Sequence, residues 1–167
     1  MSMSKKRYKV GIVPGSFDPI TVGHLDIVKR ASELCERVYV AVMINDEKEY
    51  MFDLDTRLVF AQAACEGLCN VEVISSRGML YELCRKLHAE VIIKGVRNDV
   101  DREYELKMAK YNYEHNPDAK TLLLDADAEL TGVSSTCVRE IIKRGGELCG
   151  YLPSAVIIKI NEMRGKL

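Results

Sequence analysis

Several features that quickly decide the class of a protein are missing from this sequence. The 167 residues hold no apolar run that approaches the length of a membrane span, and Met1–Arg7 lacks the apolar segment of a signal peptide. The formal net charge is −1, so no general positive field attracts nucleic acid or an anionic membrane. We therefore expect a cytoplasmic protein without a nucleic-acid or membrane partner, in which local groups hold any anionic ligand.

The cysteines show no pattern of metal or redox chemistry either. None of the six forms a Cys-x-x-Cys pair, and no His/Cys cluster has the spacing of a zinc site. Cys65 and Cys69 lie four residues apart in a helical pattern, which is typical of small core residues. We predict reduced thiols, as in a reducing compartment, and no metal site built by the protein.

What the sequence does contain is a regular alternation of short apolar segments with amphipathic ones. With 47% apolar and 29% charged residues, it suits one globular domain over residues 1–167, of which 1–7 form a flexible N-terminus. The alternation predicts an α/β fold: a doubly wound five-stranded parallel sheet with helices on both faces and ligands at the C-terminal ends of the strands. The predicted strands are 9–13, 37–43, 71–75, 90–94 and 121–126, and the predicted helices lie at about 23–35, 55–69, 79–88, 101–115, 135–144 and 154–165.

The most informative segment follows the first predicted strand. The turn signal Pro14-Gly15 ends that strand, and Thr21–His24 opens an amphipathic helix. A strand, a glycine-bearing loop and a helix start bring free backbone N–H groups to the positive end of a helix dipole, which favours a phosphate. Gly15 and Gly23 would let a phosphate approach the backbone closely, and His24 can donate from its imidazole.

Two common phosphate-binding motifs are absent from this loop. No Gly-Lys-Ser/Thr follows it, which excludes the P-loop, and the lack of Gly-x-Gly-x-x-Gly disfavours a dinucleotide fold of the dehydrogenase type. For an isolated Thr-x-Gly-His, a tight turn with an ordinary helix-start histidine would be the better interpretation. Here the Thr-x-Gly-His motif follows a buried strand and the segment Pro14–Pro19, and this context favours binding of nucleotide phosphates instead.

The segment Pro14–Val28 resembles the signature of the nucleotidyltransferase superfamily with a Thr/His-x-Gly-His motif, and most closely that of the bacterial phosphopantetheine adenylyltransferase family. The resemblance runs from residue 8 to about residue 160. It implies a Rossmann-like nucleotidyltransferase fold and transfer of an adenylyl group from ATP to 4′-phosphopantetheine, giving dephospho-coenzyme A and pyrophosphate in coenzyme A biosynthesis. Further matching blocks, in the family's order, are Lys48 before Met51-Phe52, Val91–Arg97, Glu103–Glu105 with Asn112, and Val133–Arg139.

The resemblance also implies roles for individual residues. His24, Lys48 and Arg97 are expected to act in catalysis. ATP is expected to contact Ser16, Phe17, His24, Gly95, Arg97, Glu105, Val133, Ser134, Ser135 and Thr136. The acceptor is expected to contact Ser16, Lys48, Met79, Leu80, Lys94, Met108 and Asn112, although core packing explains the three apolar residues almost as well. A homohexamer and feedback binding of coenzyme A are further implications.

This reaction places modest demands on the protein. A phosphate monoester has a second pKa of about 6, so the attacking group is already largely dianionic at neutral pH and needs no general base. The site needs cations and hydrogen-bond donors that bring two polyanions together. Magnesium is expected with ATP, held by phosphates and water, because the sequence shows no carboxylate cage.

Some interpretations stay open at this stage. Asp18 suits either a carboxylate near magnesium or one that fixes its own turn, which we favour. Arg139 suits either the phosphate site or a brace for the sheet. Lys94 stands where the family usually has arginine, Ser16 where it has threonine, and Leu130–Val133 lacks the family's aromatic residues.

Two other functions compete with this interpretation. One is a nucleotidyltransferase with nicotinamide mononucleotide or glycerol 3-phosphate as acceptor, against which Lys48, Lys94–Arg97 and Glu103–Glu105 favour the pantetheine acceptor. The other is a catalytically silent nucleotide-binding regulator. The joint presence of His24, Arg97 and the Ser-Ser-Thr segment argues against a silent protein.

Overall fold

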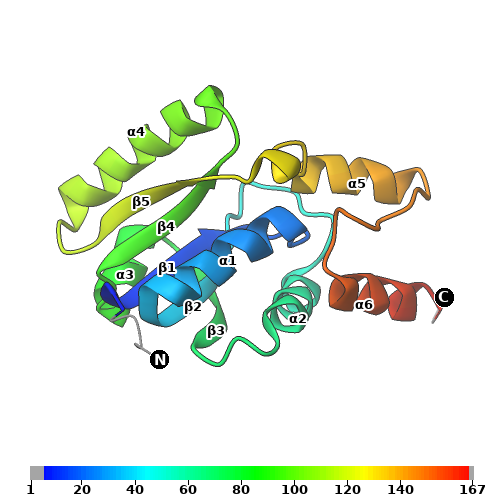
Figure 1. Cartoon of the computed structure of the whole chain (residues 1–167), viewed down its shortest axis with the longest axis horizontal. Helices are drawn as coiled ribbons and strands as arrows, with labels where there is room; N and C mark the ends of the chain where they lie inside the picture. Colours follow the sequence, from blue (N-terminus) through cyan, green and yellow to red (C-terminus); the bar gives the residue numbers. More distant parts are fainter. Residues whose placement is uncertain (1–5, 166–167) are drawn as a thin grey trace.

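The computed structural model describes residues 6–165, and a five-stranded parallel sheet forms its centre (Figure 1). β1 (Tyr8–Gly15) lies in the middle, between β2 (Cys35–Ile44) and β4 (Val91–Val96). β3 (Val71–Arg77) and β5 (Lys120–Asp125) are the two edge strands, so the strand order is β3-β2-β1-β4-β5. The predicted doubly wound sheet is confirmed.

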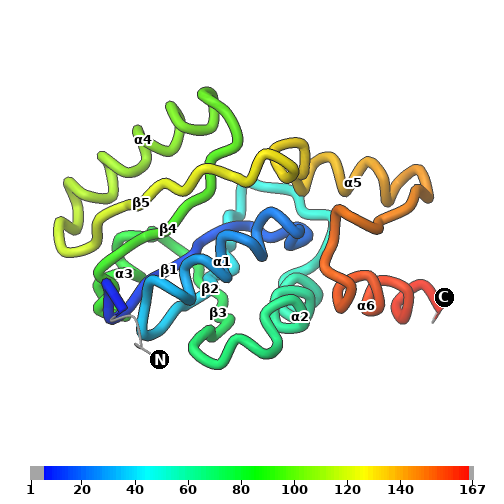
Figure 2. Tube along the Cα trace, in the orientation of Figure 1, coloured from blue at the N-terminus to red at the C-terminus, as the bar shows by residue number. Residues whose placement is uncertain are grey.

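Helices cover both faces of this sheet, as predicted. α1 (Val22–Leu34), α2 (Leu54–Cys65) and α6 (Ser154–Arg164) pack on one face, and the tube in Figure 2 shows the C-terminal α6 beside α2. α3 (Leu80–Leu87) and α4 (Asp99–His115) cover the other face.

The segment after β5 returns to the ends of the central strands. A short 3₁₀ helix (Ala128–Leu130) precedes α5 (Ser135–Lys143). Hydrogen bonds from Ser135 and Arg139 of α5 tie this helix to the loop that follows β1. This return brings residues more than a hundred positions apart in the sequence to one end of the sheet.

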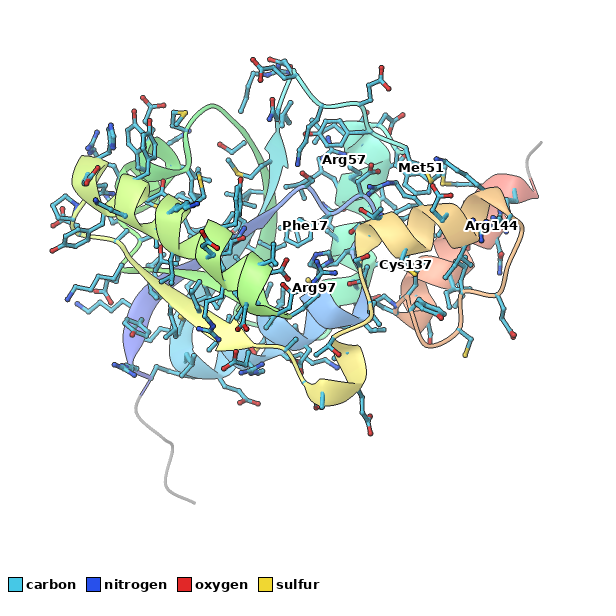
Figure 3. The ribbon with its side chains drawn as sticks, turned by 90° about the horizontal axis from the view of Figure 1, so that it is seen from above. Phe17, Met51, Arg57, Arg97, Cys137 and Arg144 are labelled. Atoms are coloured by element: carbon cyan, nitrogen blue, oxygen red, sulfur yellow. The ribbon has the colours of Figure 1, made fainter. Side chains whose placement is uncertain are left out.

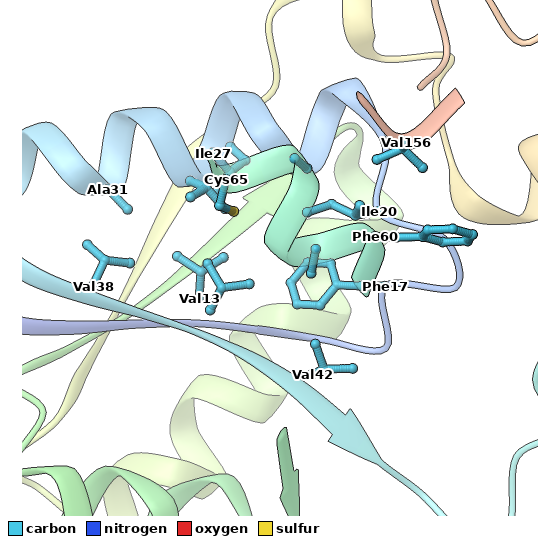
Figure 4. Close-up of a cluster of buried hydrophobic side chains, with 14 of the residues drawn as sticks. Val13, Phe17, Ile20, Ile27, Ala31, Val38, Val42, Phe60, Cys65 and Val156 are labelled. Carbon is cyan, nitrogen blue, oxygen red and sulfur yellow. The ribbon is translucent and has the colours of Figure 1, made fainter. Parts of the chain in front are cut away.

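The larger core lies between the sheet and the α1, α2 and α6 layer (Figure 4). Ile27 and Ala31 of α1, four residues apart and therefore on one helical face, pack toward Val13 and Val38 of the central strands. A smaller core under α3 contains Ile12, whose side chain points to the opposite face of the sheet from that of Val13. Each fully buried aliphatic side chain contributes about 1.5–3 kcal/mol to this packing.

The structure corrects two predicted boundaries next to the loops. β1 continues through Pro14 and Gly15, which pair with Ala41 and Val42, so the turn falls on Asp18-Pro19 and not on Pro14-Gly15. α2 ends at Cys65, four residues before the predicted end, because Gly67 adopts a left-handed φ of 88° that breaks the helix.

The ends of the described chain add little that bears on function. Of the predicted flexible N-terminus, residues 1–5 lie outside the described residues, while Lys6 and Arg7 donate hydrogen bonds to the carbonyls of Ser32 and Leu34. Among residues 6–165, no helix has both the length and the apolar character needed to cross a membrane. All six cysteines are free thiols.

Candidate active site

A cleft of about 590 Å³ opens where the chain reverses its winding direction, at the C-terminal ends of β1 and β4. Ligands of doubly wound sheets bind at this switch point, because loops of opposite winding direction leave a crevice there. The starts of α1, α4 and α5 face the same cleft. It is lined by every residue that the sequence analysis assigned to ATP or to the acceptor, with the exception of Met79 and Asn112.

His24 is held at the start of α1 by a reciprocal cap with Thr21. The backbone N–H of His24 donates to Thr21 Oγ1 at 3.3 Å, and the backbone N–H of Thr21 donates to His24 Nδ1 at 3.0 Å. Because Nδ1 accepts this bond, the ring proton of the neutral imidazole belongs on Nε2. The cap therefore fixes His24 as a donor whose free N–H is Nε2.

The surroundings of His24 also keep it uncharged. Burial is the main cause and the positive charges of Lys94 and Arg97 add to it, and together they lower its pKa from 6.5 to about 4. At neutral pH the free protein thus presents a neutral imidazole. Phe17, 2% exposed, meets the His24 ring edge-on, with ring centroids 5.1 Å apart.

Gly15, the last residue of β1, lines the cleft and lies against Phe17. A Cβ on Gly15 would lie 2.9 Å from the Phe17 ring, so Gly15 makes room for this aromatic side chain. Phe17 itself has a left-handed φ of 48°. Within residues 6–165 its amide N–H donates no hydrogen bond, which leaves it free for an anion. Gly95 similarly lets Ile27 of α1 approach β4, since a Cβ there would lie 2.9 Å from the isoleucine side chain.

Two of the three predicted cations are paired with carboxylates. Lys94 Nζ lies 3.2 Å from Glu105 Oε1, with 27% and 14% of the two side chains exposed. Arg97 Nε donates to Asp101 Oδ2 at 2.9 Å, and this hydrogen bond is the main cause of the lowered pKa of Asp101. Lys48 differs from both: its contact is with the hydroxyl of Ser16, 3.4 Å away. Figure 3 shows the molecule from above relative to Figure 1 and labels Arg97, Phe17 and Arg57.

The Ser-Ser-Thr segment offers the cleft its backbone more than its hydroxyls. Ser134 caps α5 by accepting from Cys137 N, and Ser135 Oγ donates to the Pro19 carbonyl at 2.8 Å. Thr136 Oγ1 accepts from Arg139. The first amides of α5 have no intrahelical acceptor and face the cleft, as at other anion-binding helix starts.

The structure shows which protein groups Asp18 and Arg139 contact. Asp18, 3% exposed, accepts hydrogen bonds from the amides of Met51 and Phe52 at 2.8 and 2.9 Å, so it anchors a distant loop and not its own turn. Arg139 donates to the Asp18 carbonyl at 2.9 Å and thereby braces the loop after β1. Among residues 6–165, no group of three or more His, Cys, Asp or Glu side chains could hold a metal ion.

Met79 and Asn112 lie in a side cavity of about 230 Å³ that adjoins the main cleft. The two cavities share Leu80, Lys94 and Met108 among their lining residues. Met79 and Met108 are 41% and 37% exposed, which excludes the core-packing interpretation for both. Together the cavities form one elongated groove.

Sequence reasoning missed several residues of the site. Asp101 could have been found, because it stands four residues after Arg97 and near a helix start where an acidic residue is favoured. Tyr50 and Asn45 line the cleft without a signal in their spacing. Tyr104 also lines it and lies in the matching block Glu103–Glu105, but the sequence analysis assigned it no role. Arg57 would have been placed on the solvent face of α2 by its charge alone, yet it is buried.

A doubly wound sheet with a cationic, amide-lined cleft at its switch point defines a protein that binds nucleotide phosphates. The cytidylyltransferase-like family model matches residues 12–141. A phosphopantetheine adenylyltransferase of Psychromonas ingrahamii is 38% identical over 158 residues, 92% of this chain and 98% of that one. One of Alkaliphilus metalliredigens is 43% identical over 149 residues, 89% and 95% of the two chains. The chain belongs to the cytidylyltransferase-like family and, within it, to the phosphopantetheine adenylyltransferases.

Proposed function

We propose that this protein is an adenylyltransferase that joins ATP to 4′-phosphopantetheine and releases dephospho-coenzyme A and pyrophosphate. The observation that carries this proposal is that one groove collects the residues predicted for both substrates. The near full-length similarity to phosphopantetheine adenylyltransferases supports the choice of acceptor.

The chemistry is a displacement at phosphorus. An oxygen of the acceptor phosphate attacks the α-phosphorus of ATP, and the bond to the pyrophosphate oxygen breaks. The carboxylates facing the cleft, Asp101 and Glu105, are each engaged by a cation, which suits a reaction that needs no base. The protein contributes orientation and stabilisation of the charge that moves onto the leaving group.

His24 is the donor best placed for that charge. Its Nε2–H is fixed by the cap with Thr21, so no reorganisation is needed when charge develops on the phosphates. The free amides of Phe17 and of the α5 start add further donors. We assign the ATP phosphates to this part of the groove.

The acceptor phosphate is assigned to the place where Lys48 meets Ser16, in the cleft that Lys94 also lines. The side cavity with Met79, Met108 and Asn112 then takes the pantetheine arm, whose apolar and amide groups match such a lining. Arg97 and Lys94 exchange their carboxylate partners for phosphates when the substrates bind. Coenzyme A carries both an adenylyl and a pantetheine half, so the same groove suits it as a feedback ligand.

Magnesium belongs to this proposal as a companion of ATP. The paired carboxylates and the absence of a metal-binding cluster among residues 6–165 fit an ion that keeps its waters and its phosphate ligands, not one caged by the protein. Bound in this way, it neutralises part of the triphosphate charge. The Asp18 carboxylate accepts hydrogen bonds from the amides of Met51 and Phe52, so we do not assign it to the magnesium ion.

Assembly and location are further parts of the proposal. The exposed apolar side chains of α4, among them Val100, Tyr104 and Leu106, support an oligomer, and the resemblance implies a hexamer. Light scattering at micromolar concentration tests the oligomer, and a monomer would contradict it. The free thiols suit the cytoplasm.

The deciding experiment measures pyrophosphate release from ATP and Mg²⁺ with a panel of phosphorylated acceptors. We expect turnover with 4′-phosphopantetheine and the appearance of dephospho-coenzyme A. Equal or faster turnover with nicotinamide mononucleotide or glycerol 3-phosphate would overturn the acceptor. Binding of ATP without turnover of any acceptor would favour a silent regulator.

A further inference from the structure

Arg57 is a buried cation without a carboxylate partner within residues 6–165. It projects from the first turns of α2 and is 2% exposed, although a guanidinium stays charged at any ordinary pH. Its Nη1 donates to the carbonyls of Ser16 at 2.8 Å and Met43 at 3.2 Å, and its Nε has no acceptor. The carbon of its guanidinium lies 3.9 Å from the centre of the Tyr50 ring. Carbonyl dipoles and an aromatic face contact the guanidinium, and no carboxylate of residues 6–165 lies within ion-pair distance of it.

The three partners of Arg57 belong to three different segments of the groove wall. Ser16 lies in the loop after β1, Met43 lies near the end of β2, and Tyr50 lies in the 45–52 loop, where its hydroxyl accepts from Asn45 N at 2.9 Å. These contacts converge behind the point where Lys48 Nζ approaches Ser16 Oγ. Lys48 itself is exposed and forms no ion pair with a carboxylate of the described residues 6–165, so its place depends on the loop that carries it.

We propose that Arg57, together with Tyr50, is a positioning residue that holds the Lys48 loop against the Ser16 loop and so shapes the pocket for the acceptor phosphate. This inference rests on the proposed function. A planar guanidinium can bond two carbonyls and stack on a ring at once, whereas a lysine ammonium in its place offers a point charge without a stacking face. A buried cation close behind the pocket also favours a dianionic ligand, since no carboxylate within residues 6–165 forms an ion pair with it.

The test compares steady-state constants of the full chain and of four variants, with both substrates varied. Arg57→Lys keeps the charge but loses the fork and the stack, and it should raise the KM for phosphopantetheine about tenfold or more, the scale of a lost charge-assisted hydrogen bond. The KM for ATP should stay close to the wild-type value. Tyr50→Leu, at a partly exposed position, should shift the same constant in the same direction. Tyr50→Phe keeps the ring but loses the hydroxyl that accepts from Asn45 N, and it should shift the constant less than Tyr50→Leu.

A matched control separates positioning from stability. Val38→Ala removes a fully buried side chain near the start of β2, so it should lower the melting temperature without changing the KM for phosphopantetheine. If Arg57→Lys and Tyr50→Leu behave like this control, the inference is wrong. If Arg57→Lys does not fold, the comparison of Tyr50→Leu with Tyr50→Phe decides alone. If the wild-type protein neither binds nor adenylylates phosphopantetheine, the proposed function fails first and the inference with it.

Discussion

The state of His24 can be tested by comparing what different side chains restore at this position. The structure makes His24 a neutral donor from Nε2, because Thr21 donates to Nδ1 and the pKa of the ring is lowered to about 4. His24→Ala removes the donor and should lower kcat by about 10²–10³-fold, equivalent to about 2.7–4 kcal/mol of lost transition-state stabilisation. The KM for ATP should change much less, since this bond strengthens mainly in the transition state.

Substituting glutamine or asparagine for His24 tests whether an uncharged hydrogen-bond donor is sufficient and where its nitrogen must lie. The amide nitrogen of glutamine reaches approximately where Nε2 of histidine lies, whereas that of asparagine lies nearer to Nδ1. His24→Gln should therefore recover part of the lost kcat, and His24→Asn should remain as slow as His24→Ala. If His24→Gln were as slow as His24→Ala in a folded protein, the imidazolium charge would be the active feature and our reasoning would be refuted.

Stability provides the control for this series. Loss of the acceptor for Thr21 N removes half of the reciprocal cap at the start of α1, and a lost cap costs about 1 kcal/mol. In a protein of this size such a loss lowers the melting temperature by about 2–4 °C. A much larger loss would indicate that the decrease in kcat reflects misfolding, so the melting temperature must accompany each rate.

Three other predictions follow from the same contacts. Because folding lowers the pKa of His24 from 6.5 to about 4, the unfolded chain binds a proton at His24 more readily than the folded protein does. The stability of the wild-type protein should therefore fall relative to that of His24→Gln as the pH drops from 6.5 to 4. Equal melting curves across that range would contradict this prediction. Lys94→Ala should raise the KM for phosphopantetheine far more than the KM for ATP, and Lys94→Arg should be tolerated. Adding Glu105→Gln to Lys94→Ala should relieve this defect, because it removes the carboxylate that the first substitution leaves unpaired. A rise in the KM for ATP alone would reverse the assignment of the two phosphate pockets. Asp18→Asn leaves one of the Met51 and Phe52 amides without a full acceptor, so urea unfolding should show a loss of about 1–3 kcal/mol while the magnesium dependence stays unchanged.

The fold was predictable because its signals are local and repeated. Each strand of the parallel sheet is a short apolar run, and each helix carries a face that must be buried, as in Ile27 and Ala31 of α1. The errors fell where backbone conformation depends on distant packing. Pro14-Gly15 is a turn signal by composition, but pairing with Ala41 and Val42 keeps it extended.

The candidate site was predictable where the residue type itself carries the chemistry. His24, Lys48, Lys94, Arg97 and the Ser-Ser-Thr segment all line one cleft, because loops at one edge of a parallel sheet converge in space. The partners that set their state were not predictable. Nothing in the spacing indicates that Glu105 neutralises Lys94 or that Ser135 is bonded to the carbonyl of Pro19.

Two residues whose contacts sequence reasoning missed, Asp18 and Arg57, share a physical feature: their partners are backbone groups of segments distant in the chain. Asp18 accepts from amides 33 and 34 residues later, and Arg57 donates to carbonyls 41 and 14 residues earlier. A backbone partner leaves no complementary residue type in the sequence, so pattern and charge cannot reveal it. Both residues contact the end of the loop that carries Lys48: Asp18 accepts from the amide of Phe52, and Arg57 stacks on the ring of Tyr50. The predicted catalytic groups can thus be recognised from their residue types, whereas the buried charges that hold the neighbouring loops are bonded to the main chain and cannot.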